Sequence, residues 1–68
     1  MKVEIEHTAT LTTFVMNIDG QAHLIKELYT PHDGDTEVVH ISKAYDYEVP
    51  PGPEWDRIEA IFQQNRTE

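Results

Sequence analysis

Apolar and polar residues alternate with a period of two along the first part of the chain. The apolar residues occupy odd positions from Val3 to Leu11 and even positions from Phe14 to Ile18. A period of two is typical of a half-buried strand, and a change of parity moves the apolar set to the other face. We therefore predict a strand over residues 2–18, with a bend or bulge near residues 12–13 that absorbs the change.

The turn after this strand determines how the next one pairs. Asn17-Ile18-Asp19-Gly20 suits a type I turn with Gly20 as a left-handed bulge, which places Asn17 opposite Gln21. A two-residue Asp-Gly turn is the alternative. With the first geometry, the strand over residues 21–29 shares one face of the hairpin with Phe14 and Met16 through Ala22, Leu24 and Leu28. The other face then carries Val15, His23, Ile25, Glu27 and Tyr29.

The clearest strand pattern covers residues 37–49. β-Branched and aromatic residues occupy one parity of this segment and polar residues occupy the other, and Pro50-Pro51 ends it. After these prolines, Pro53 is suited to a first helical position, so we predict a helix over residues 53–64. Its apolar stripe consists of Trp55, Ile58, Ile61 and Phe62.

Together these elements predict one small α+β domain over residues 1–68. The predicted architecture is a three-stranded antiparallel β-meander, in the order βββα, with the C-terminal helix packed on one face. The other face is left open. On the open face we expect carboxylates from all three strands, with histidines and apolar side chains among them: Glu4, Glu6, Glu27, Asp46 and Glu48, with His23, Ile25, Tyr29 and His40 between them.

The charge of the chain limits its partners. Thirteen Asp and Glu stand against five Lys and Arg, which gives a formal net charge of −8. Such a chain is repelled by phosphates and by anionic headgroups, so we expect neither direct nucleic-acid binding nor membrane binding, and we expect basic partners. Because the sequence has no cysteine, no long apolar run and no signal-peptide pattern, we expect a soluble cytoplasmic protein.

These features favour a non-enzymatic binding module without a cofactor. A regular carboxylate array on a flat sheet imitates the charge of a nucleic-acid backbone, so the module would inhibit or regulate a basic DNA- or RNA-binding protein. The short acidic format is similar to that of phage-encoded and mobile-element inhibitors as a class. The alternative is a structural or assembly protein that uses apolar contacts, with its acidity serving solubility. The predicted contacts are Glu4, Glu6, Glu27, Asp46, Glu48, Tyr29 and Ile25.

Three other groups of residues have the side chains for a metal site, for catalysis or for self-association. The turn at residues 31–35 brings His32, Asp33 and Asp35 together with His40 nearby, but its order does not match a calcium loop, so no metal site is predicted. Ser42 with His40, or paired aspartates in that turn, could serve catalysis, but no catalytic motif surrounds them. The edge near Tyr47 and Val49 could instead pair with a second copy in a homodimer.

Overall fold

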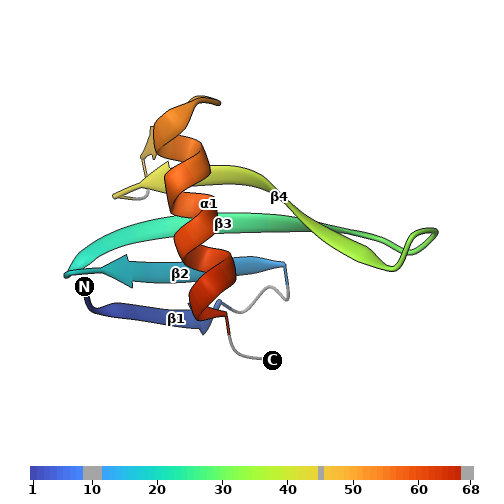
Figure 1. The fold of residues 1–68 in the computed structure, drawn as a ribbon, viewed down its shortest axis with the longest axis horizontal. Coiled ribbons are helices and arrows are strands. Elements are labelled where there is room, and N and C mark those ends of the chain that lie inside the picture. Colours follow the sequence, from blue (N-terminus) through green and yellow to red (C-terminus); the bar gives the residue numbers. More distant parts are fainter. Residues whose placement is uncertain (9–11, 45, 67–68) are drawn as a thin grey trace.

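The protein forms an antiparallel sheet with one helix across it (Figure 1). The computed structural model describes residues 1–8, 12–44 and 46–66. The strands lie side by side in chain order, so the α+β class is confirmed, while the prediction of three strands is wrong because the described residues form five. The elements are β1 (Val3–His7), β2 (Thr13–Ile18), β3 (Gln21–Thr30), β4 (Asp35–Lys43), β5 (Tyr47–Glu48) and α1 (Pro53–Asn65).

The predicted first strand is in fact a hairpin. β1 pairs antiparallel with β2, and Ile5 lies opposite Met16. Directly opposed residues of an antiparallel pair share a face, so odd residues of β1 and even residues of β2 point to the same side. The change of parity therefore marks a chain reversal rather than a bulge. Residues 9–11, just before the expected bend, lie outside the described residues.

The predicted strand over residues 37–49 is likewise divided. It becomes β4 and the short β5, and Ala44 between them has a φ of 53°, in the left-handed region. Tyr45 lies outside the described residues. The sheet has a bulge within β4 rather than near residues 12–13. Lys26 lies opposite His40 but Glu27 lies opposite Val38, so the register of β4 on β3 shifts between them. An extra residue on one strand at this point changes which parity of β4 faces each side.

The turn between β2 and β3 has the two-residue geometry that was the alternative prediction. Ile18 lies opposite Gln21, and Asp19 and Gly20 have φ angles of 49° and 87°. Positive φ at both central residues defines a type I′ turn, whose twist matches that of the flanking strands. The predicted type I turn with a Gly20 bulge would have been a three-residue turn, with Asn17 opposite Gln21. Compared with that turn, the observed geometry shifts the register of β3 by one residue, which exchanges the two faces of the strand.

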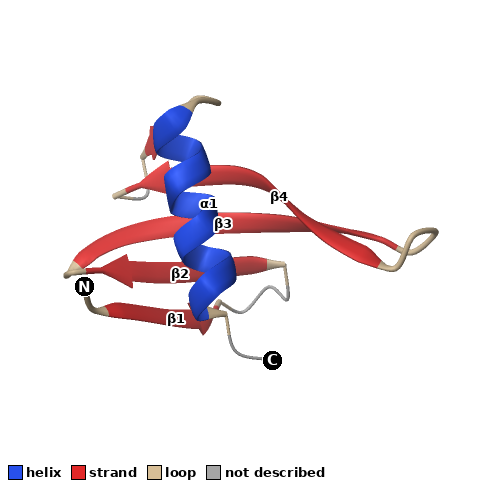
Figure 2. Cartoon of the chain, viewed as in Figure 1, coloured by secondary structure: helices blue, strands red, loops and turns tan. Residues whose placement is uncertain are grey.

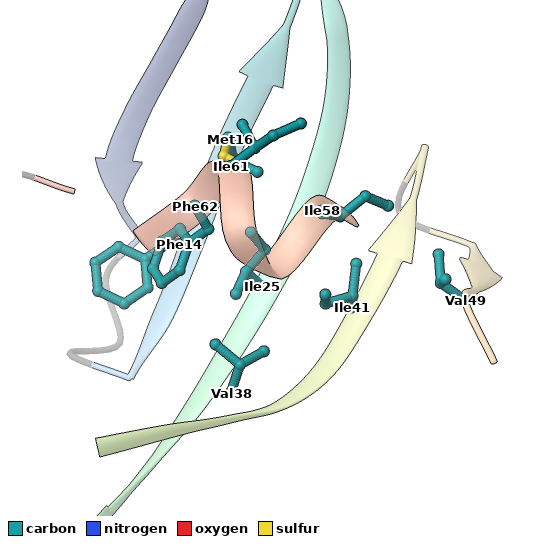
Figure 3. Packing of buried hydrophobic residues seen from close by; sticks show 9 residues of the cluster. All are labelled: Phe14, Met16, Ile25, Val38, Ile41, Val49, Ile58, Ile61 and Phe62. Carbon is teal, nitrogen blue, oxygen red and sulfur yellow. The ribbon is translucent and has the colours of Figure 1, made fainter. Parts of the chain in front are cut away.

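Helix α1 crosses the strands on one face of the sheet (Figure 2), and the described residues form no second helix that could cover the other face. It begins at Pro53, which is tolerated there because an N–H in the first turn would have no partner within the helix. The acidic Glu54 and Asp56 stand at the positive end of the helix dipole. Between helix and sheet lies the hydrophobic core (Figure 3). Its buried apolar residues are Phe14, Met16, Ile25, Val38, Ile41, Val49, Ile58, Ile61 and Phe62.

The β3–β4 hairpin extends beyond the helix and the other strands as an arm (Figure 1). β2 pairs with β3 as far as Lys26, and the N–H of Glu27 still donates to the carbonyl oxygen of Thr12 at 2.8 Å. From Leu28 to Glu37 the two strands pair only with each other among the described residues, and residues 28–37 are called the arm. Leu28 and Tyr29 on this arm are among the exposed large hydrophobic residues. In the described part of the chain, no helix is both long and apolar enough to cross a membrane.

Candidate functional site: the uncovered face

The sheet side that points away from α1 is called the open face here. One row of opposed residues crosses all five strands on this side: Glu6, Val15, Leu24, Ser42 and Glu48. The row has a carboxylate at each end and uncharged side chains between them. Strands lie about 4.8 Å apart, so the two ends of the row are roughly 19 Å apart. The open face therefore carries its negative charge along two opposite edges.

Other residues follow from the same register. Glu4 lies opposite Asn17, two residues from Glu6, and Leu28 lies opposite Glu37 on the arm. Lys26, opposite His40, is the one Lys or Arg that the residues of the five strands place on this face. The open-face carboxylates on the strands are Glu4, Glu6, Asp35, Glu37 and Glu48, all on exposed residues. Negative charge thus exceeds positive charge on this face.

Sequence reasoning missed Glu37 because of the bulge. In an unbroken strand an odd residue would face away from His40 and Ser42. The shift between Lys26 and Glu27 instead brings Glu37 to the same side as His40. Nothing in the local sequence marks this bulge, so the pairing had to come from the structure.

Two predicted contact residues are on the other side of the sheet. Ile25 has no exposed surface and belongs to the core, and Glu27 is only 5% exposed. Their placement on the open face is wrong because the type I′ turn moved the register of β3 by one residue. His23 moved with them and is also buried, with its Nδ1 3.1 Å from the carbonyl oxygen of Gln21.

The remaining predicted contacts are exposed, but not all lie on the open face. Glu4, Glu6 and Glu48 do, as their register partners require. Asp46 is exposed in the turn that joins β4 to β5. Tyr29 is 52% exposed on the arm, opposite Thr36, and follows the parity of the helix side.

Three polar side chains on the open face form a connected array. His40 Nε2 lies 2.7 Å from Ser42 Oγ, and His40 Nδ1 lies 3.3 Å from Glu48 Oε1. This is the order of contacts in a serine hydrolase triad. However, Ser42 is only 7% exposed and sits within the sheet, flanked by Leu24 and Glu48. These two contacts hold the imidazole of His40 between Ser42 and Glu48.

Two grooves among the described residues are slightly smaller than a usual ligand pocket. Their volumes are about 250 and 270 Å³, and one lies beside His23 and Lys43 and the other beside Val39 and Trp55. Ligand pockets usually measure about 300–1,000 Å³. In the described part of the chain no three His, Asp or Glu side chains gather so that they could hold a metal ion.

Of the two residues named for the homodimer alternative, the structure buries one and exposes the other. The backbone N–H of Val49 donates to the carbonyl oxygen of Ile41 at 2.9 Å, and the Val49 side chain is buried in the core. Tyr47 remains exposed, and Lys43 Nζ lies 5.1 Å from the centre of its ring. A second copy would meet Tyr47 here but not Val49.

Comparisons with known proteins add no family to these observations. No family model matches the chain, and neither the curated proteins nor the solved structures include a match.

Proposed function

We propose that this protein is a non-enzymatic acidic binding module whose open face binds a basic, nucleic-acid-binding protein and inhibits or regulates it. The observation that carries the proposal is the distribution of charge on the open face. Its carboxylates stand on both edges of a sheet side that no described element covers, with Lys26 as the one lysine that the strands place among them. The proposed contacts are Glu4, Glu6, Glu37 and Glu48, together with the exposed Asp46 in the turn between β4 and β5.

The spacing of these carboxylates supports the imitation of a nucleic-acid backbone. Glu4 and Glu6 are one pleat repeat apart, roughly 6.6 Å. Duplex DNA carries a phosphate about every 3.4 Å along each strand, so the β1 edge has about half that charge density. A basic cleft that recognises two rows of phosphates would meet two separated rows of carboxylates here. Such complementarity mainly speeds association and makes it depend on salt.

Charge reversal at one edge tests this proposal. The variant Glu4→Lys/Glu6→Lys changes the net charge from −8 to −4 and replaces the β1 carboxylates. Asp33→Lys/Asp56→Lys makes the same change of net charge at exposed positions in the arm turn and the helix, so it serves as the matched control. Each protein is immobilised and exposed to lysate of the source cells at about 50 and 200 mM salt, the range over which phosphate-directed contacts weaken strongly.

The expected result is retention of basic nucleic-acid-binding proteins by the wild type and the control variant at the lower salt only. Glu4→Lys/Glu6→Lys should lose them, and added duplex DNA should displace them from the wild type. Equal retention by both variants, or a captured protein that resists salt and DNA, would contradict binding through the open face.

A second candidate function has its own observation. Leu28, Tyr29, Val39 and Tyr47 are large apolar residues that are each about half exposed. A structural or assembly protein would use such residues as its contacts, with the charge serving solubility. In that case Tyr29→Ala would weaken partner binding more than Glu4→Lys/Glu6→Lys, and retention would persist at the higher salt.

A further inference from the structure

The two edge strands of the sheet differ in how much of their backbone is available. The edge strand β5 has only two residues and covers the outer edge of β4 at Ser42 and Lys43. The remainder of β4 is irregular because its register shifts opposite Lys26 and Glu27. β1, by contrast, pairs in regular register over all five of its residues, and no described segment pairs with its outer side (Figure 1). A regular unpaired edge is the template on which another strand can add.

The backbone groups that face this outer edge can be identified from the hydrogen bonds on the inner side. The carbonyl oxygen of Lys2 accepts from the N–H of Asp19 at 2.8 Å, and the N–H of Thr8 donates to the carbonyl oxygen of Thr13 at 3.0 Å. Residues along a strand alternate in the side to which their N–H and C=O point. Even residues of β1 therefore face β2, and the free donors and acceptors belong to Val3, Ile5 and His7.

The side chains along this edge also alternate. Glu4 and Glu6 are exposed on the open face. Val3 and Ile5 point to the helix side, where they pack against the core while remaining partly exposed. A strand that continued the sheet would place one set of its side chains beside the carboxylates and the other set beside Val3 and Ile5.

The charges decide between the occupants of this edge. A second copy paired antiparallel through β1 would bring glutamates of both copies together on one face, and like charges in that position are destabilising. The net charge of −8 on each copy adds to that repulsion. A segment with lysine or arginine at alternate positions instead meets opposite charges. The edge therefore favours a basic partner over self-association.

We propose that the outer edge of β1 binds an extended segment of the basic partner as a sixth strand of the sheet. The segment alternates basic residues, which lie beside Glu4 and Glu6, with apolar residues, which lie beside Val3 and Ile5. This inference rests on the proposed function and adds to it the form in which the partner binds. Backbone pairing fixes the position of the segment, and the alternation selects its sequence.

A pair of model peptides tests the alternation. The probe is a dye-labelled peptide with the core Lys-Val-Lys-Val-Lys, and its control is Lys-Lys-Lys-Val-Val, which has the same composition and charge. Binding is measured by fluorescence anisotropy at low salt. We expect the alternating peptide to bind at least about tenfold more tightly. Equal binding of both peptides would overturn strand addition while leaving an acidic surface that binds basic partners, and absence of binding by either would overturn the inference and weaken the proposed function with it.

A backbone change in the protein tests the pairing itself. The chain has 68 residues, which is within reach of chemical synthesis, so Ile5 can be replaced by its N-methyl form with the side chain unchanged. Its N–H faces outward, so the sheet of the protein loses no hydrogen bond. The matched control carries N-methyl-Glu54, in the first turn of α1, where the N–H has no intrahelical partner.

Circular dichroism establishes that both synthetic proteins fold like the unmodified chain before binding is compared. The methyl group at Ile5 should weaken binding of the alternating peptide at least about tenfold and leave binding of the control peptide Lys-Lys-Lys-Val-Val unchanged. The N-methyl-Glu54 protein should bind both peptides as the unmodified protein does. Undiminished binding of the alternating peptide by the folded N-methyl-Ile5 protein would refute the sixth strand.

Discussion

The ion pair between Glu27 and Arg66 allows a quantitative test of the packing. Arg66, directly after α1, donates hydrogen bonds to both carboxylate oxygens of Glu27 at 2.5 and 2.9 Å. Its guanidinium also lies 5.7 Å from the ring centre of Phe14 and 5.5 Å from that of Phe62. Because the Glu27 side chain is only 4% exposed, Arg66→Ala leaves a carboxylate in the core without its cation.

The expected loss follows from the burial of the two groups. Removing one partner of a buried ion pair costs about 3–5 kcal/mol. The Arg66 side chain is 23% exposed, so water can reach the carboxylate after the substitution, and we expect the lower end, about 3 kcal/mol. Natural domains have about 0.05–0.15 kcal/mol of stability per residue. The substitution should therefore remove a large part of the stability of this chain.

A double-mutant cycle separates the pair from other effects of truncation. Glu27→Gln, Arg66→Ala and the double variant are unfolded in urea, with Trp55 fluorescence and circular dichroism as probes. We expect a coupling energy of about 2 kcal/mol, since the double variant no longer contains the unpaired carboxylate. The control cycle uses Lys43 and Glu54, whose ion pair is 2.8 Å long with side chains 27% and 48% exposed. Exposed pairs contribute less than about 1 kcal/mol.

The comparison between the two cycles decides the outcome. A coupling at Glu27 and Arg66 no larger than that at Lys43 and Glu54 would refute the claim that burial strengthens this pair. A change in the urea dependence of only one variant would show instead that the two-state treatment fails for it.

Two further predictions concern the turn and the core. Gly20→Ala places a Cβ on a residue with a φ of 87°, so we expect the free energy of unfolding to fall by about 1 kcal/mol. Thermal unfolding at the wild-type midpoint would contradict the type I′ geometry. Phe62→Ala removes a ring with no exposed surface, which costs about 3–5 kcal/mol and should leave the chain largely unfolded at 25 °C by circular dichroism. The exposed neighbour Gln63→Ala should leave the unfolding midpoint within a few degrees of the wild type, and a similar effect of both changes would contradict the packing of α1.

Strand β3 explains why the sequence predicts the fold class better than the site. One of its faces carries Ala22, Leu24 and Leu28, and the other carries His23, Ile25 and Glu27. The first set is the more apolar, so pattern reasoning buries it beneath the helix. The structure buries the second set, and the cost of placing Glu27 there is offset by Arg66, which is 39 residues away in the chain. The periodicity of a single strand contains no information about a partner at that separation.

The elements predicted best are those with local signals. Pro50-Pro51 and the stripe of α1 locate the end of the strands and the helix, because proline geometry and a period near 3.6 act over a few residues. The β1–β2 hairpin and the β4 bulge were missed because each depends on pairing between strands. Glu4, Glu6 and Glu48 nevertheless lie on the open face. Their side depends on the alternation of side chains within each strand, and the wrong number of strands did not change that alternation.

The turn at Asp19 and Gly20 connects local backbone geometry to the charge of the proposed binding surface. In the three-residue turn, the open face would have carried Glu27, and Lys26 would have pointed toward the helix. The type I′ turn reverses these two neighbours, so the open face exchanges a negative side chain for a positive one and its charge rises by two units. Lys26 then separates Glu4 and Glu6 on β1 from the carboxylates on β4 and β5. The sign of φ at Asp19 thus helps to produce the two separated acidic edges on which both proposals rest.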